Sequence, residues 1–343
     1  RDVHAYNVVL HTVAHNGLTK ISHESVSKLA LYWGPQPTPE MLRTLHPFQK
    51  VNHFPYSWHL GRKDLLWKNV LKLQRQWPKQ VDIMPRGFNL PDDHQAWVIA
   101  REQQPAAFWI WKPVCLSCGK GIRIFSSDVP PATDRKLSKK PGVVQKYVDR
   151  PMLLEGYKFD LRIYVVVTSY DPLKVYVNEE GLVRLATEKY SPSPESLKRR
   201  MMHLTNYSVN KHADTYVQNQ DKGPPASPTS SPQTGGDDDA GSEGEAGAES
   251  PCGGEEEEPA EASPGVGAGA VHSFKWSLAE LREHFAKLGR DYDLMSERIR
   301  DLIIKTLLAV EPTTVSALQQ GASFGGLGST PQLGANQNCF EIF

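Results

Sequence analysis

The chain has 343 residues, of which 39% are hydrophobic and 23% are charged, a composition typical of a globular protein with a sizeable core. It contains no run of about 18 apolar residues, so the sequence predicts no membrane-spanning helix. Four cysteines are too few for a disulfide framework and favour a reducing compartment. The first residues show no signal-peptide pattern, and because Arg1 rather than Met begins the chain, we expect a fragment.

The formal net charge of zero hides an uneven distribution of charge. Residues 219–273 contain twelve acidic residues and a single lysine, Lys222. The remainder has 38 basic and 27 acidic residues and therefore a formal charge of about +11. A basic body of this kind attracts an acidic partner, and charge alone does not distinguish nucleic acid from an acidic peptide.

The predicted elements alternate between helices and strands. Apolar periodicity predicts a helix over 61–77, with Leu66, Val70 and Leu73 on one stripe, and a second helix over 299–310. Residues 320–337 read as a loop, and 219–273 read as a disordered insert because they offer almost nothing to bury. The class is mixed α/β with antiparallel strand pairs. The predicted strands are 108–111, 122–125, 143–148, 159–169 and 173–178, the last two forming a hairpin.

Three charged side chains lie beside a long apolar run that begins at Gly156. Because neighbouring residues of a strand face opposite sides, Lys158, Asp160 and Arg162 share one face. The pattern fits two interpretations. One is a structural salt-bridge ladder on a solvent-exposed face; the other is an active-site face on which lysine and arginine hold phosphate.

Weaker signals accompany this face. Lys112 ends an apolar strand, and the turn at 119–121 has two glycines that would let backbone amides approach an anion, although it is not a P-loop. The polar run 203–211 reads equally well as a capped turn. Cys115 and Cys118 have metal or redox spacing, but a second pair is lacking, which favours two ordinary loop thiols. The residues together indicate a nucleotide-binding α/β enzyme.

At these same positions the chain resembles the tubulin tyrosine ligase-like enzymes, and most closely their polyglutamylase branch. The resemblance covers roughly residues 40–218 and 274–343, and 1–39 more loosely. The matching motifs are Val51-Asn-His-Phe-Pro55, Gly61-Arg-Lys-Asp64, Trp111-Lys-Pro113, Gln145-Lys-Tyr147, Lys158-Phe-Asp-Leu-Arg162, Tyr190-Ser-Pro-Ser193 and His203-Leu-Thr-Asn-Tyr-Ser-Val-Asn-Lys211.

The resemblance implies an ATP-grasp fold, an α/β (α+β) architecture in which two antiparallel sheets clamp ATP. It divides the chain into N-terminal and central subdomains (1–105), a first part of the grasp core (106–218), the acidic insert (219–273) and a second part of the core (274–343). The insert then interrupts the grasp core rather than separating two independent domains.

The resemblance also implies roles for individual residues. Lys158, Asp160 and Arg162 would be catalytic. Nucleotide contacts would come from Lys112, Cys118, Gly119, Gln145, Lys146, Tyr147, Val148, Lys158, Phe159, Asp160, Thr205 and Asn206. The incoming glutamate would be held by Arg184, Tyr207, Ser208 and Lys275, with Arg184 suited to its α-carboxylate as a bidentate donor.

The implied reaction adds glutamate to glutamate side chains in tubulin C-terminal tails. A tail γ-carboxylate would attack ATP to give an acylphosphate, which the amine of free glutamate would then attack. The tail carboxylate and the triphosphate are both anions, so catalysis would depend on positive charge from lysine, arginine and Mg²⁺ to offset their repulsion. A basic body fits such an acidic tail on a microtubule, and we expect a monomeric protein of the cytoplasm and cytoskeleton, including the cilium or basal body.

Two departures from the family pattern stand out. Cys118 precedes Gly119 where the family usually has arginine, and Lys120 is the nearest cation. In the family the Mg²⁺ ligands follow the motif that stands here at 339–343, so we expect them beyond residue 343. We therefore predict no metal ligand within this sequence, and Glu341 is not assigned as one. From this we expect little or no ligase activity from residues 1–343 alone.

Several alternatives stay open at the level of sequence. The ligase could use glycine or tyrosine instead of glutamate, or the fold could serve a non-catalytic binder of acidic tubulin tails. A nucleic-acid binder is suggested only by the basic charge and has no recognised motif. The acidic insert reads as an inert loop expansion, as a mimic of the tubulin tail in which Glu255 to Glu258 compete for the substrate groove, or as a segment that is itself glutamylated.

Overall fold

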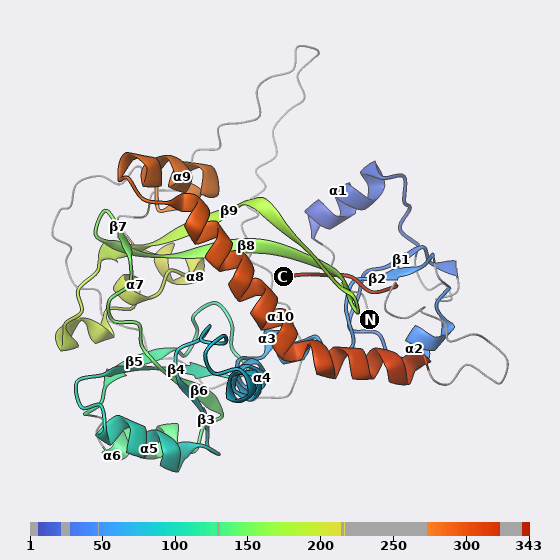
Figure 1. Cartoon of the computed structure of the whole chain (residues 1–343). Helices are drawn as coiled ribbons and strands as arrows, with labels where there is room; N and C mark the ends of the chain where they lie inside the picture. The colour runs from blue at the N-terminus through green and yellow to red at the C-terminus, as the bar shows by residue number, and fades with distance from the viewer. Residues whose placement is uncertain are drawn as a thin grey trace.

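The computed structural model describes residues 6–21, 28–46, 48–128, 131–213, 216, 273–322 and 338–343. In this part the chain is mixed α/β, with two antiparallel sheets and a short parallel strand pair, as the sequence predicted. Figure 1 shows the two sheets one above the other, with the long helix α10 crossing beside both. Apart from Ser273, the predicted insert lies outside the described residues.

The first sheet has four antiparallel strands in the order β3-β6-β4-β5. Alternation along β4 sends Trp109 and Trp111 to the face covered by α5, where they pack with the fully buried Trp97. The opposite face is left for the site. The elements are β3 (Gly87–Leu90), α5 (His94–Glu102), β4 (Phe108–Pro113), β5 (Arg123–Ser126), α6 (Pro131–Leu137) and β6 (Gly142–Lys146).

The second sheet is built on a long hairpin and has the order β10-β9-β8-β11, with β7 also pairing with β8. The sequence predicted a strand ending at residue 178 and, after a turn, a separate strand that carries Arg184, but β9 is continuous over 17 residues. Its Gly181 lies against Ile163, where any side chain would collide with the Arg162 carbonyl oxygen, so glycine here permits pairing rather than a turn. The strands are β7 (Leu153–Leu154), β8 (Tyr157–Tyr170), β9 (Leu173–Lys189), β10 (Lys275–Ser277) and β11 (Glu341–Ile342).

Helices connect the two sheets. The predicted helix 61–77 is α4, and α10 extends well beyond the predicted 299–310, into the region predicted to be a loop. Pro312 lies within α10, which changes direction along its length in Figure 1, as a proline in a helix would cause. The remaining elements are α1 (Asn7–His15), β1 (Leu31–Tyr32), α2 (Pro39–Thr44), β2 (Lys50–Val51), α3 (Trp58–Gly61), α4 (Lys63–Gln76), α7 (Arg200–His203), α8 (Tyr207–Asn210), α9 (Leu278–Lys287) and α10 (Tyr292–Ala322).

The C-terminal residues join the N-terminal segments to the second sheet. Cys339 forms a parallel bridge with Val51, while Glu341 pairs with Val167 on β8. The Glu341 carboxylate also accepts a hydrogen bond from the Phe54 amide at 3.2 Å. Leu307 and Val310 of α10 belong to the same core, which therefore combines chain segments from both ends. None of the described helices is long and apolar enough to cross a bilayer.

Candidate functional site

The inner face of the four-stranded sheet presents an apolar row that ends in a hydrogen-bonded lysine–glutamine pair. Ile124, Ile110 and Gln145 lie in register across three strands, and Lys112 follows Ile110 by two residues on the same face. The Lys112 ammonium donates a hydrogen bond to the Gln145 side-chain oxygen at 2.9 Å. Strand pairing therefore brings two of the predicted nucleotide-contacting residues together.

Three lysines from three different elements form an electrostatically coupled cluster. Burial and, to a smaller extent, the neighbouring charge of Lys112 lower the pKa of Lys158 on β8 to about 8, against the opposite effect of Asp160. Burial likewise lowers the pKa of Lys112, with a contribution from Lys63 at the start of α4. The pKa of Lys63 is itself lowered by burial. Three cations brought together in a partly desolvated space are suited to a multivalent anion.

Asp160 and Arg184 form a bidentate ion pair across β8 and β9. The Nε and one Nη of Arg184 each donate to a different carboxylate oxygen at 2.8 Å. Lys275 on β10 is the register partner of Arg184 on its other side. The predicted catalytic aspartate and two predicted glutamate-binding cations thus form one row. A substrate carboxylate that uses this edge of Arg184 must take the place of Asp160.

The glycine turn between β4 and β5 is docked on the segment around α7 and α8. Gly119 has a φ of +78°, and a Cβ there would lie 2.8 Å from the Asn206 side-chain oxygen. Ser208 donates from its hydroxyl to the Cys118 carbonyl at 2.7 Å. Arg200 donates to the Gly119 carbonyl at 3.0 Å. Arg200 therefore places a cation against the turn at which the family's usual arginine is replaced by Cys118.

Asn210 fixes the polar run 203–211 to β9. Its side-chain oxygen accepts hydrogen bonds from the backbone amide and the hydroxyl of Thr187, at 3.0 and 2.8 Å. Its amide group donates to the carbonyls of Leu204 and Asn206. This side chain is only 1% exposed, and both its oxygen and its NH₂ group are hydrogen-bonded within the protein. Asn210 therefore holds the run in place rather than binding a ligand.

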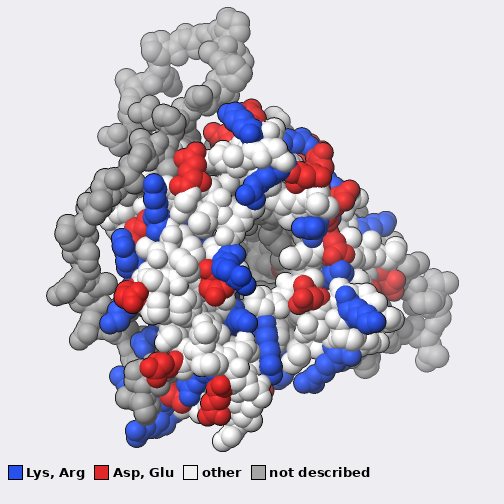
Figure 2. Space-filling view, turned by 60° about the vertical axis from the view of Figure 1, so that its left-hand side comes forward, with Lys and Arg blue, Asp and Glu red and all other residues white. Residues whose placement is uncertain are grey.

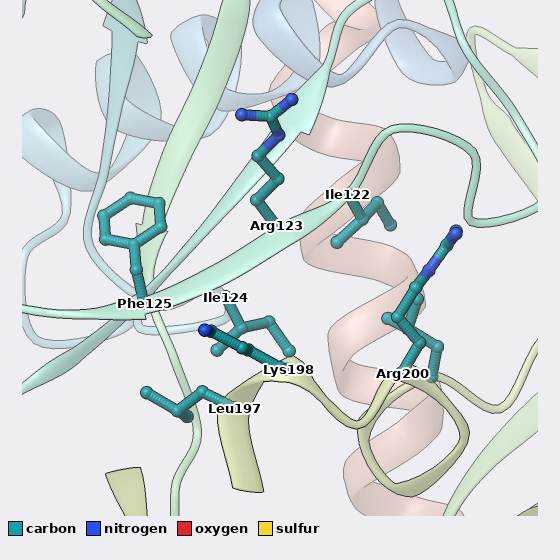
Figure 3. Close-up of a pocket in the computed structure, with 8 residues that line it drawn as sticks. Ile122, Arg123, Ile124, Phe125, Leu197, Lys198 and Arg200 are labelled. Atoms are coloured by element: carbon teal, nitrogen blue, oxygen red, sulfur yellow. The ribbon is translucent and has the colours of Figure 1, made fainter. Parts of the chain in front are cut away.

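A pocket of about 300 Å³ opens between β5 and the 3-10 helix Pro194–Lys198. Ile122, Ile124 and Leu204 give it apolar walls, and Lys198 and Arg200 bring cations to its border. Figure 3 shows Arg123 and Phe125 projecting to one side of β5, with Ile124 nearer to Lys198. Its size is at the lower limit for small-molecule sites, and an apolar slot with cationic borders suits an aromatic ring joined to a negatively charged group.

The other predicted site residues are more scattered. Thr205 is buried, whereas Arg162 and Val148 are exposed. Lys146 donates to the side chain of Gln104, outside the lysine cluster. Phe159 was predicted among the nucleotide contacts, but alternation along β8 packs it against the apolar cluster of Leu154 and Val183. Tyr207 stacks edge-on with Tyr216 at 5.8 Å.

Sequence reasoning gave no role to three residues that the structure brings to this site. Lys63 lies in the Gly61-Arg-Lys-Asp64 motif that supported the resemblance, and its proximity to Lys112 is a consequence of tertiary packing. Arg200 precedes the polar run 203–211 and His203 begins it, but neither residue was assigned a role of its own. A search for every cation inside a matching motif would have found Lys63.

No group of three or more His, Cys, Asp or Glu residues that could hold a metal gathers within the described ranges. Asp160 is the carboxylate on the lysine-bearing strand face, and it is engaged by Arg184. On the molecular surface, Figure 2 shows basic and acidic side chains interspersed around a central hollow, so this face is not uniformly basic.

The comparison with protein families matches residues 41–232 to the tubulin-tyrosine ligase family. Human tubulin monoglutamylase TTLL4 is 34% identical over 316 residues, which are 91% of this chain and 22% of that protein. Human tubulin polyglutamylase TTLL5 is 32% identical over 299 residues, 86% of this chain and 19% of that protein.

A third relative is tubulin polyglutamylase ttll-4 of Caenorhabditis elegans, which is 32% identical over 280 residues, or 82% of this chain and 37% of that protein. The chain thus spans about a fifth of the two human relatives. The family match covers more than half of the chain and includes the lysine cluster, the glycine turn and the polar run around α8. The chain belongs to the tubulin-tyrosine ligase family.

Proposed function

We propose that this chain is the catalytic region of an ATP-dependent ligase that joins glutamate to γ-carboxylates in tubulin C-terminal tails. The observation that carries the proposal is the coupled cluster of Lys63, Lys112 and Lys158 next to an apolar pocket. The relatives named as tubulin glutamylases support the choice of amino acid and of substrate.

ATP fits this arrangement in two parts. The adenine ring would enter the pocket beside Ile124 and Leu204, and the triphosphate would lie along the three lysines. Lys158 links the two parts because its ammonium donates to the carbonyl of His203, the residue before Leu204. Two antiparallel sheets flank the site, which supports an ATP-grasp fold.

The proposed chemistry proceeds in two displacements. A carboxylate oxygen of the tail glutamate attacks the γ-phosphorus, and the bond from that phosphorus to the bridging oxygen breaks to release ADP and leave an acylphosphate. The amine of free glutamate then attacks the acyl carbon, loses a proton, and displaces phosphate to form the isopeptide bond. In the first step the lysine cluster stabilises the negative charges of the carboxylate and the triphosphate as they approach. Arg184 and Lys275 orient the incoming glutamate.

Mg²⁺ accompanies ATP in reactions of this type and requires several oxygen ligands in near-octahedral order. Within the residues that the structure describes, the carboxylates do not gather in such a set. We therefore assign Mg²⁺ to no residue and derive no step through it.

The proposed partners follow from the substrate. They are microtubules and free glutamate, and the proposed setting is the cytoskeleton of the cytoplasm and cilium. The binding groove for the acidic tail would begin at the lysine cluster, where the carboxylate must reach the γ-phosphate.

Incorporation of labelled glutamate, glycine and tyrosine into microtubules tests the proposal, with the natural full-length protein that contains this chain. We expect ATP-dependent glutamate incorporation that is abolished in Lys158→Met. Incorporation of another amino acid would change the substrate, and tail binding without incorporation in the presence of ATP would favour a non-catalytic binder.

A further inference from the structure

The ammonium group of Lys158 is held from two sides. It donates to the Tyr147 hydroxyl at 2.8 Å and to the His203 carbonyl at 2.8 Å. It also lies 4.6 Å from the centre of the Tyr147 ring, within the range of a cation–π contact. A lysine side chain has four rotatable bonds, and these contacts select one of its positions before any ligand arrives.

The hydrogen-bond partners constrain where the protons of this arrangement lie. An ammonium group only donates, so the Tyr147 oxygen accepts from Lys158 and its own proton must go elsewhere. Two acceptors lie within reach, Nδ1 of His203 at 2.9 Å and the hydroxyl oxygen of Tyr190, whose own proton goes to the Asp149 carbonyl. The ring proton of His203 lies on Nε2, which donates to the Ser196 carbonyl at 2.9 Å. The arrangement in which Tyr147 donates to His203 satisfies all four groups.

The far end of this chain of hydrogen bonds is fixed to the backbone. The Ser196 hydroxyl donates to the carbonyls of Ser191 and Ser193, at 2.8 and 2.7 Å. His203 is 2% exposed, and burial lowers its pKa and so favours the neutral ring; the hydrogen bond to the Ser196 carbonyl acts in the opposite direction, and the charges of Lys158 and Arg199 lower the pKa. A neutral His203 is the form that accepts the Tyr147 proton.

We propose that Tyr147 and His203 are positioning residues that hold the Lys158 ammonium through a one-directional relay anchored on the Ser196 carbonyl. Residue 196 belongs to the same 3-10 helix that lines the pocket through Leu197 and Lys198. The relay therefore fixes the distance between the pocket and the lysine. This inference rests on the proposed function, because it gives the relay the task of aligning Lys158 with the phosphates of a nucleotide.

Tyr147→Phe removes the relay's hydroxyl and leaves the ring in place. We expect ATP affinity to fall about tenfold, with the loss in affinity rather than in the maximal rate of turnover. The pH at which ATP affinity declines should also move downward, because the Lys158 ammonium loses an acceptor. Tyr170→Phe is the matched control, since it removes another buried tyrosine hydroxyl from a different core cluster.

His203→Asn and His203→Leu test the next member of the relay. Asparagine can present an acceptor near the position of Nδ1, whereas leucine cannot, so we expect Asn to retain most of the ATP affinity that Leu loses. Thermal unfolding of both variants separates this effect from loss of the fold. Equal ATP affinity in the two folded variants would overturn the relay.

Competitive acetylation of Lys158, followed by mass spectrometry across pH, tests the relay without ATP. We expect the titration midpoint of the Lys158 amine to be lower in Tyr147→Phe than in the unmodified protein or in Tyr170→Phe. An unchanged midpoint would overturn the relay even if ATP binds. A shifted midpoint in a protein that fails to bind ATP would instead uphold the relay and refute the proposed function.

Discussion

At the scale of single residues, the site depends on keeping positive charge where water is scarce. Lys158, Lys112 and Lys63 each have a pKa lowered first by burial, and each of the first two is lowered further by the next lysine along the cluster. Such a cluster is unfavourable in the absence of a ligand, and a polyanion would relieve the repulsion. At these positions, the same positive charges that raise the affinity for an anionic ligand lower the stability of the ligand-free fold.

The Lys158 pKa predicts how stability changes with pH. The unfolded chain keeps this lysine protonated up to its ordinary pKa of 10.5, whereas the folded chain releases the proton near 8. Between these values the unfolded state binds more protons, so stability rises with pH. Relative to Lys158→Met, we expect the unmodified protein to gain about 2 kcal/mol between pH 7 and 10. Urea unfolding at the two pH values measures this gain, and a difference that stays constant or falls would contradict it.

A second residue-scale prediction concerns Lys63, which only the structure brought into the site. Lys63→Met removes one cation from the cluster, and we expect ATP to bind about tenfold more weakly. Lys68→Met is the matched control, because Lys68 lies exposed on the same helix. Isothermal titration of ATP into both variants measures the effect. Equal affinities would place Lys63 outside the nucleotide site.

At the scale of elements, short irregular segments rather than long strands bring the site together. The strands were largely predictable from sequence because alternating apolar residues define them, and the hairpin at Asp171-Pro172 followed from its turn residues. The continuation of β9 through Glu180 and Gly181 was not predictable, since glycine in a polar stretch is typical of turns. Its pairing depends on contact with Arg162, which only the folded hairpin supplies.

The glycine turn gives the element-scale prediction. Gly119→Ala adds a Cβ in a left-handed conformation and places it against Asn206, so we expect a loss of stability of about 1–2 kcal/mol and weaker ATP binding. Gly17→Ala is the control, because Gly17 has a similar φ of +74° with open space around it. Thermal unfolding and ATP titration are measured for both. Loss of ATP binding in Gly17→Ala as well would show that the effect is not local to the turn.

At the scale of the whole molecule, residues distant in sequence share one core. Val51 pairs with Cys339, and Val165 exchanges two backbone hydrogen bonds with Phe343. This is also where sequence reasoning was limited. Motifs located Lys112 and Lys158 because each is local, but the relay joins Tyr147 to a histidine 56 positions away, and no local pattern specifies such a pair. Burial and proton direction, which fix its role, arise only after folding.

Cysteine reactivity provides a whole-molecule prediction. Burial raises the pKa of the Cys339 thiol to about 12, whereas Cys115 is exposed. The thiolate is the reactive form, so we expect iodoacetamide at neutral pH to label Cys115 readily and Cys339 only when the C-terminal residues leave the core. Mass spectrometry of the labelled peptides measures both. Rapid labelling of Cys339 in the folded protein would contradict its place in the shared core.

The two described ends that border residues 217–272 meet on the same side of the molecule. The ring of Tyr216 stacks on that of Phe274, with centroids 6.1 Å apart and an interplanar angle of 19°. Because this aromatic contact already brings the two bordering residues together, we expect the packing of the flanking sheets to be insensitive to the number of residues between positions 216 and 273. We therefore expect that a reporter can be inserted between Tyr216 and Phe274, that a short Gly-Ser linker can join them, or that new termini can be placed there by circular permutation. In each case the melting temperature of the protein should stay unchanged.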